Sequence, residues 1–169
     1  MSRQIDFRSV SPHPADVVYA TMVDPAYLRA RLERIGGPGA ALLEHSADVE
    51  GARYVLRQGV DARHLPSVVR SVLPGDLTIE RSERWGREDS GRYVGNVEVT
   101  IPGAPASAAG GIRLRDLPDG GSELEVRAAV RVSVPLIGGK IEGAVGDQVR
   151  RLLEEETAFT EAWLDGKGD

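Results

Sequence analysis

The strongest constraint in this sequence is a change of hydrophobic period that divides it into two unequal parts. Between residues 40 and 134, apolar and polar residues alternate, which is typical of strands with one buried face. Turns rich in Gly, Pro and Asp divide this stretch into strands that we expect at 42–50, 53–60, 77–85, 92–101, 107–117 and 122–134. All connections but one are short enough for hairpins, so the pattern predicts an antiparallel sheet.

Other elements precede or interrupt this alternating stretch. Residues 5–8 also alternate and add a seventh strand, and two short helices follow it. Pro14 suits the first turn of one helix, whereas Asp24 and Pro25 suit the N-cap and first position of the other. The one long connection, residues 61–74, predicts an inserted helical turn or two, because its apolar residues have helical spacing: Leu65, Val68, Val69 and Val72.

The C-terminal segment has the period of one long helix, predicted at residues 138–164. Its apolar stripe spans ~40° of arc and has Val149 beside it; the stripe consists of Ile141, Val145, Leu152, Phe159 and Trp163. At 1.5 Å per residue this helix is roughly 40 Å long, enough to cross a sheet. We therefore expect an α+β fold in which a curved, seven-stranded antiparallel sheet wraps around the helix and largely buries Trp85, Phe159 and Trp163.

Composition restricts the class of protein. The 169 residues suit a single domain, and 41% hydrophobic with 28% charged residues is ordinary for a globular protein. A net charge of −5 does not attract nucleic acid or an anionic membrane. No apolar run is long enough to span a membrane, no secretory signal is recognisable and cysteine is absent, so we expect a cytoplasmic protein without thiolate chemistry.

The order of elements resembles the helix-grip fold of the START-like superfamily, also called SRPBCC. Four motifs resemble an uncharacterised bacterial branch of it: LPGDL at 73–77, ERW at 83–85, PGAP at 102–105 and VPLIGGKIE at 134–142. The superfamily includes polyketide cyclases, lipid-transfer domains and proteins similar to birch-pollen allergens. The resemblance covers nearly the whole chain and implies one START-like domain, residues 1–169, with a ligand space between sheet and helix.

The sequence lacks the motifs of several common chemistries. It contains no GxxxxGKS/T phosphate loop, no GxGxxG and no GxSxG nucleophile elbow. Three histidines, His13, His45 and His64, are far apart and lack the spacing of metal ligands, although His64 lies near the expected cavity mouth. We therefore assign no catalytic residue, metal or cofactor.

Polar residues interrupt two faces that should be apolar. On the strand at 77–85, Arg81 and Glu83 share the face that is expected to meet the helix. On the preceding strand, Tyr54 and Gln58 flank Leu56 on one face. Charged groups there must pair, lie beyond the helix or reach a wet cavity. Two interpretations stay open: structural polar groups at the end of the sheet, or polar groups that orient a ligand.

One carboxylate, Glu156, falls inside the apolar stripe of the long helix, and Gln148 borders that stripe. Such a carboxylate is either a general base with a raised pKa or, more commonly, a group neutralised by an arginine of the sheet. If the cavity holds a ligand with an acidic head, Arg81 is the natural counter-charge, with Glu83 holding it in place.

These patterns favour a protein that binds or carries a small hydrophobic molecule, lipid- or polyketide-like, between sheet and helix. The alternatives are a cyclase- or dehydratase-type enzyme in the same cavity, or a structural or interaction protein without a ligand. The expected polar contacts are Tyr54, Gln58, Arg81 and Glu83. The expected apolar walls are Leu56, Val97, Val99, Ile112, Leu114, Val126, Val130, Val145 and Leu152.

Overall fold

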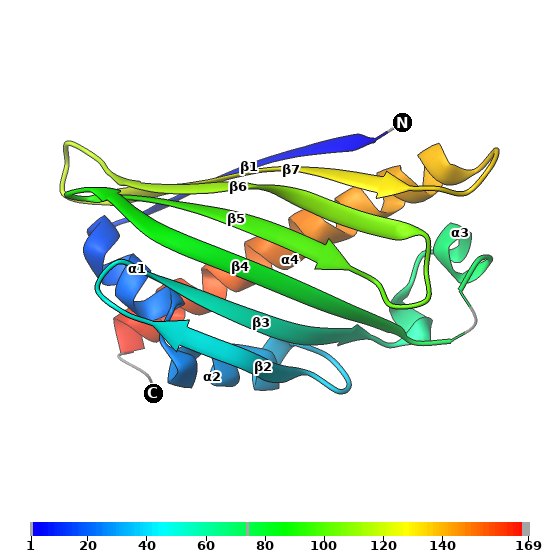
Figure 1. The fold of residues 1–169 in the computed structure, drawn as a ribbon, viewed down its shortest axis with the longest axis horizontal. Helices are drawn as coiled ribbons and strands as arrows, with labels where there is room; N and C mark the ends of the chain where they lie inside the picture. Colours follow the sequence, from blue (N-terminus) through cyan, green and yellow to red (C-terminus); the bar gives the residue numbers. More distant parts are fainter. Residues whose placement is uncertain (1, 74, 167–169) are drawn as a thin grey trace.

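The computed structural model describes residues 2–73 and 75–166 as a twisted sheet with helices against one face (Figure 1). The strands are β1 (Arg3–Ser11), β2 (Ala41–Ala47), β3 (Gly51–Val60), β4 (Leu77–Asp89), β5 (Arg92–Thr100), β6 (Ala106–Asp116) and β7 (Ser122–Val132). The helices are α1 (Ala15–Met22), α2 (Pro25–Ile35), the 3-10 helix η1 (Ala62–His64), α3 (Ser67–Arg70) and α4 (Gly138–Gly166). The predicted α+β helix-grip fold is confirmed.

The sheet has seven antiparallel strands in the order β1-β7-β6-β5-β4-β3-β2. Each strand from β2 to β7 pairs with its neighbour in sequence, whereas β1 pairs with β7 at one edge. The α1–α2 segment therefore carries the chain from one edge of the sheet to the other. Figure 1 shows α4 crossing the same face diagonally, with α1 and α2 beside its C-terminal half. All these helices cover one face, which fixes the inner side of the sheet.

Local sequence signals set the position of α2, which closes one end of this face. The carboxylate of Asp24 accepts a hydrogen bond from the Tyr27 amide at 3.3 Å, and Pro25 occupies the first turn, as predicted. After α2, Gly37 has a φ of +78° and passes so close to β3 that a Cβ atom there would lie 1.8 Å from the Gly59 carbonyl oxygen. Only glycine permits that approach, and it brings the α2–β2 connection against the sheet.

The insertion between β3 and β4 contains the predicted helical turns, η1 and α3. Asp61 caps η1 by accepting a hydrogen bond from the Arg63 amide at 2.9 Å. Leu65 and Val69 are buried, whereas Val72 is exposed. Two of the four apolar residues thus anchor the insertion to the core, and α3 packs against α4.

The long helix is where the burial prediction needs correction. Trp85 is 3% exposed as expected, but Phe159 and Trp163 are only half-buried. Both rings pack against Tyr27, with centroids 5.7 and 5.6 Å away, where α2 meets α4. The most buried positions of α4 are instead Gly138, Ile141, Glu142, Gly146, Leu153, Glu156 and Thr160. Phe159 and Trp163 are half-buried because they lie beyond the sheet-facing part of the stripe, against Tyr27 of α2.

We expect Phe159→Ala to lower the free energy of unfolding by about 2.5 kcal/mol. A half-buried ring removes roughly 100 Å² from water at about 25 cal/mol per Å². A fully buried ring typically costs about 3–5 kcal/mol. Urea unfolding of the wild type and of Phe159→Ala measures the difference. A loss equal to that of Trp85→Ala would show that the ring is more buried than the structure describes.

Candidate functional site

A cavity of about 740 Å³, here called the main cavity, lies between the inner face of the sheet and α4. Residues of β1 and β3–β7 line one side, and residues 141–155 of α4 line the other. The α2–β2 connection and the β3–β4 insertion form its borders. Ligand cavities in proteins typically measure roughly 300–1,000 Å³. The main cavity therefore has room for a small organic molecule.

Small side chains on β6 and β7 create this space. Ala106, Ala108 and Ala128 line it, and Gly110 pairs with Ala128 in the β6–β7 ladder. Larger residues at these positions would project toward α4. Most of the remaining wall is Val, Ile and Leu, and the described lining contains no Phe, Tyr or Trp. The interior is thus aliphatic as well as apolar.

The main cavity reaches the surface beside α3. Its exposed lining residues include Arg63 and His64 from η1, and Arg151 and Glu155 from α4. Figure 1 places α3 at the far end of the molecule from α1 and α2. Charged side chains of η1 and α4 thus border the mouth of the aliphatic interior.

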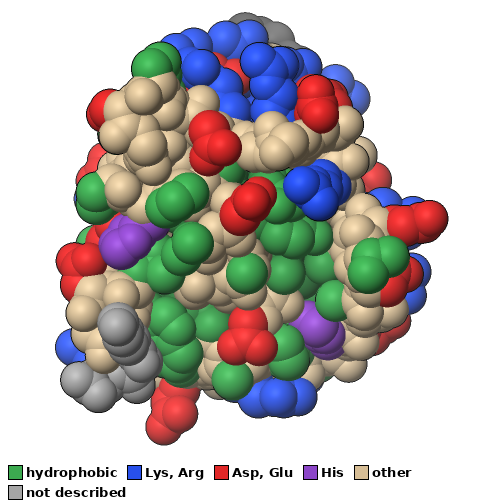
Figure 2. Space-filling model, turned by 90° about the vertical axis from the view of Figure 1, so that its left-hand side faces the viewer, with side chains coloured by type: hydrophobic (Ala, Val, Ile, Leu, Met, Phe, Trp, Pro, Cys, Tyr) green, Lys and Arg blue, Asp and Glu red, His purple; other side chains and the backbone are tan. Residues whose placement is uncertain are grey.

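Figure 2 shows the opposite end of the molecule, the α1–α2 end, where hydrophobic side chains gather in the middle of the face below a group of basic ones.

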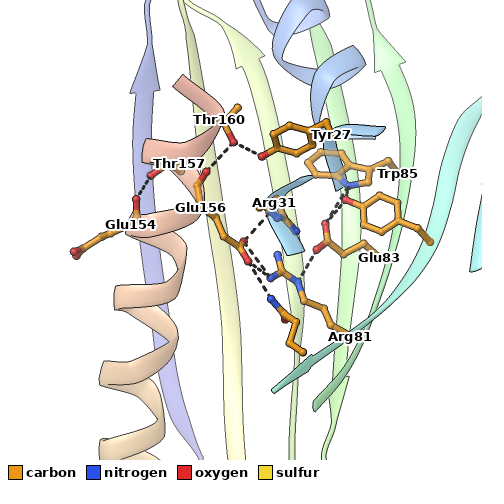
Figure 3. A network of polar contacts seen from close by, with 11 residues as sticks. Tyr27, Arg31, Arg81, Glu83, Trp85, Glu154, Glu156, Thr157 and Thr160 are labelled. Carbon is orange, nitrogen blue, oxygen red and sulfur yellow. Dashed lines mark hydrogen bonds and ion pairs between the residues drawn. The ribbon is translucent and has the colours of Figure 1, made fainter. Parts of the chain in front are cut away.

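Four buried charged side chains, here called the charge cluster, lie between the main cavity and α2 (Figure 3). Arg81 Nε is 2.6 Å from Glu83 Oε2, and Arg81 Nη1 donates to both carboxylate oxygens of Glu156, at 3.1 and 2.8 Å. Arg31 Nη1 lies 3.7 Å from Glu156 Oε1. None of the four residues is more than 9% exposed. Two arginines and two glutamates leave the charge cluster with no net charge.

Neutral side chains also donate hydrogen bonds to the carboxylates of Glu83 and Glu156. The Tyr54 hydroxyl donates to Glu83 Oε1 at 2.8 Å, and Trp85 Nε1 lies 3.2 Å from the same oxygen. Gln58 Nε2 donates to Glu156 Oε2 at 3.4 Å. Tyr54 lies opposite Glu83 in the β3–β4 register, so the alternation of the two strands places this pair on the inner face.

The surrounding charges decide how these groups ionise. Burial by itself raises the pKa of Glu156, but the positive charges of Arg31 and Arg81 outweigh burial and lower it. Burial likewise lowers the pKa of Arg81, and the carboxylates of Glu156 and Glu83 raise it overall. The interpretation of Glu156 as a general base with a raised pKa is therefore wrong. It is an ionised carboxylate that is neutralised by arginine, as the alternative interpretation held.

A second, smaller cavity of about 40 Å³ adjoins the charge cluster on the side of α1. Arg81 lines both cavities and so lies between them. Four buried side-chain atoms of residues on the small cavity have no hydrogen-bond partner among residues 2–73 and 75–166: Arg31 Nε, Arg31 Nη2, Ser122 Oγ and Glu83 Oε2. Of these, Glu83 Oε2 is in the ion pair with Arg81. Such a volume has room for roughly two or three water molecules, which would satisfy these groups.

The structure places nine of the predicted site residues on the main cavity. They are Gln58, Arg81, Val97, Val99, Ile112, Val126, Val130, Val145 and Leu152. Glu83 and Leu114 border the small cavity instead. Tyr54 and Leu56 line neither cavity, because the Tyr54 hydroxyl is bonded to Glu83 and Leu56 is completely buried in the core.

Sequence reasoning missed Arg31 and the small residues of the wall. Arg31 belongs to a helix with several other charged residues, so nothing local distinguishes it from an exposed arginine. Its partner Glu156 lies in the last helix, far away in sequence. The small residues of the wall could have been found from the sequence. The run ASAAGG at 106–111 is unusual for a strand whose inner face must be filled.

The histidines lie apart from the charge cluster. His45 Nε2 donates to the Val23 carbonyl at 2.7 Å, and His64 borders the mouth of the main cavity. His13 lies 3.2 Å from Asp165 and forms with it and Glu161 a group of potential metal ligands. This group joins the two ends of the chain, so sequence spacing could not reveal it.

A curved antiparallel sheet that holds a long C-terminal helix, with a cavity between them, is the helix-grip fold. The chain belongs to the family described as "Protein of unknown function (DUF2505)", whose profile matches residues 6–164. An uncharacterised protein of Mycobacterium tuberculosis (strain ATCC 25618 / H37Rv) is 28% identical over 177 residues, covering 97% of this chain and 98% of the relative.

Solved structures agree on the fold. The protein TTHA0849 from Thermus thermophilus is similar with a TM-score of 0.62 and 16% identity, covering 99% of this chain and 100% of that one. The ZhuI aromatase/cyclase from Streptomyces sp. R1128 has a TM-score of 0.55 and 15% identity over 99% and 94% of the two chains. A START superfamily protein from Mycobacterium smegmatis has a TM-score of 0.54 and 11% identity over 96% and 97%. These proteins share the predicted helix-grip fold with this chain.

Within the described residues, none of the helices combines the length and apolar character that crossing a lipid bilayer requires.

Proposed function

We propose that this protein binds or carries a small hydrophobic molecule in the main cavity. The observation that carries the proposal is a space of about 740 Å³ whose walls are mostly aliphatic and which opens to the surface beside α3. An unfilled apolar space of this size forgoes packing contacts that a filled core would make. A ligand of matching chemistry would restore those contacts, and one solved structure with this fold is an aromatase/cyclase.

Polar contacts with the ligand come, in this proposal, from Gln58 and Arg81. Both lie on inner-face positions of β3 and β4, and both border the main cavity. The apolar contacts come from the strand residues and from Val145 and Leu152 of α4. The enzyme alternative is less well supported, because Glu156, the buried carboxylate proposed as a base, is paired with two arginines that lower its pKa.

We expect saturable binding of cis-parinaryl alcohol, a flexible fluorescent polyene, with one molecule bound per chain. The reason is that a linear aliphatic molecule matches the walls and can pass the mouth beside α3. Fluorescence titration measures the affinity, and at a hundredfold excess over Kd the ligand should stabilise the folded protein by about 2.7 kcal/mol. Native mass spectrometry of freshly purified protein checks independently for a co-purified molecule. Absence of both saturable binding and thermal stabilisation would contradict the proposal.

A further inference from the structure

We propose that the main cavity selects molecules with an aliphatic body and an uncharged polar head, and that Glu156 determines this selectivity. The inference rests on the proposed function and specifies the chemical class of the ligand. It reverses the expectation from sequence that Arg81 serves as counter-charge for an acidic head.

The positive charge at the wall of the main cavity is already balanced by carboxylates. Arg81 is the charged group of the cluster that borders this cavity, and it already contacts two carboxylates, Glu83 at 2.6 Å and Glu156 at 2.8 Å. With Arg31, the charge cluster sums to zero. A ligand carboxylate beside Arg81 would set three buried negative charges against two positive ones. Burying a charge without compensation is costly, so an acid should be rejected.

An uncharged head avoids this cost. A hydroxyl or carbonyl oxygen can accept a hydrogen bond from a guanidinium or amide group without changing the net charge. Gln58 and Arg81 offer such groups on the wall. Arg31 faces the small cavity on the other side of Arg81, so Gln58 and Arg81 are the members of this polar group that a head in the main cavity can reach. The site therefore suits a neutral oxygen-bearing head.

The mouth does not offer an alternative place for an acid. Arg63 is paired with Asp61 at 3.1 Å, and Arg151 donates to Gln148. Glu155 adds a further negative charge to the same rim. The two arginines of the mouth are thus matched by two carboxylates, as in the charge cluster.

The wall itself specifies the body of the ligand. Its apolar residues are Val, Ile, Leu, Ala and Pro, and the described lining holds no Phe, Tyr or Trp against which a planar ring could stack. Flexible alkyl chains make their contacts with such branched aliphatic side chains through dispersion alone. The structure thereby favours the lipid-like over the aromatic polyketide-like ligand.

The test compares cis-parinaric acid with cis-parinaryl alcohol, which share the same polyene chain and differ in the charge of the head. Fluorescence titrations at neutral pH use the wild type, Glu156→Gln and Glu154→Gln. Glu154 is exposed on the same helix, so its variant has the same change in net charge outside the charge cluster. Anilinonaphthalene sulfonate serves as an aromatic, anionic comparison.

We expect the wild type and Glu154→Gln to bind the alcohol at least about tenfold more tightly than the acid, a difference of about 1.4 kcal/mol. In Glu156→Gln the charge cluster gains one positive charge, so the acid should bind at least about fivefold more tightly than it binds the wild type. Equal affinities for acid and alcohol in the wild type would overturn the inference. So would an acid affinity that does not change in a folded Glu156→Gln protein.

Two further outcomes are distinguishable from these. If neither polyene binds the wild type, the proposed function itself fails, and the selectivity inference falls with it. If Glu156→Gln does not fold, Glu83→Gln removes the other negative charge beside Arg81 and should show the same gain for the acid. The wild-type comparison decides the preference for an uncharged head, and the variants decide whether the carboxylates of the charge cluster cause it.

Discussion

Replacing Glu156 with alanine should lower the free energy of unfolding by about 3–5 kcal/mol. The substitution leaves Arg31 and Arg81 buried with Glu83 as the one remaining carboxylate of the charge cluster. Removing one partner of a buried ion pair typically costs this much, because the remaining charge loses its compensation in a medium that cannot hydrate it. Gln58 also loses its hydrogen-bond acceptor. Urea unfolding at neutral pH measures the loss.

The stabilisation that Glu156 contributes should decrease as the pH falls. The pKa of Glu156 is lowered in the folded protein, from an ordinary value of 4.5, so its contribution to stability is present above that value. It is lost as the pH falls through the lowered pKa of the folded state. The wild type and Glu156→Ala should therefore converge in stability in acid. Glu154→Ala on the exposed side of α4 is the control and should stay within about 0.5 kcal/mol of the wild type. A Glu156→Ala protein as stable as this control would show that the charge cluster is not formed.

Filling the main cavity should abolish ligand binding without destroying the fold. Ala128 lies on β7, opposite Ile5 of β1 and Gly110 of β6, and its side chain borders the main cavity. A phenyl ring introduced by Ala128→Phe would enter the space that the proposed ligand occupies. We expect the affinity for cis-parinaryl alcohol to fall at least about tenfold, as measured by fluorescence titration. The thermal midpoint should hold or rise, because the ring gains apolar contacts in an unfilled space.

The neighbouring residue supplies the control for this substitution. Ala129 is next in β7, so the alternation of the strand places its side chain on the outer face of the sheet. Ala129→Phe adds the same ring to the same strand and should bind the alcohol as the wild type does. If both variants bind normally while folded, the ligand does not occupy the main cavity. If both lose binding, the effect arises from the strand rather than from the cavity.

Much of the molecule could be predicted from the sequence, because strand and helix periods are local. Arg81 and Glu83 were placed on the inner face by counting alternate residues, and the structure buries both. Asp24 and Pro25 predicted the start of α2 through capping, which involves residues only a few positions apart. The stripe on the long helix predicted which face meets the sheet to within part of a turn, although it overstated the burial of Phe159 and Trp163.

Hydrophobic period, turn residues and caps thus determined the elements, their faces and the antiparallel sheet of this protein. Only the tertiary structure decided that Glu156 meets Arg31 and Arg81 together, and that the alanines of β6 and β7 leave a space beneath α4. The physical reason is that ion pairing and cavity volume depend on distances between side chains from separate elements. The period of each element fixes the direction of its side chains, whereas the approach of the elements fixes what those side chains contact.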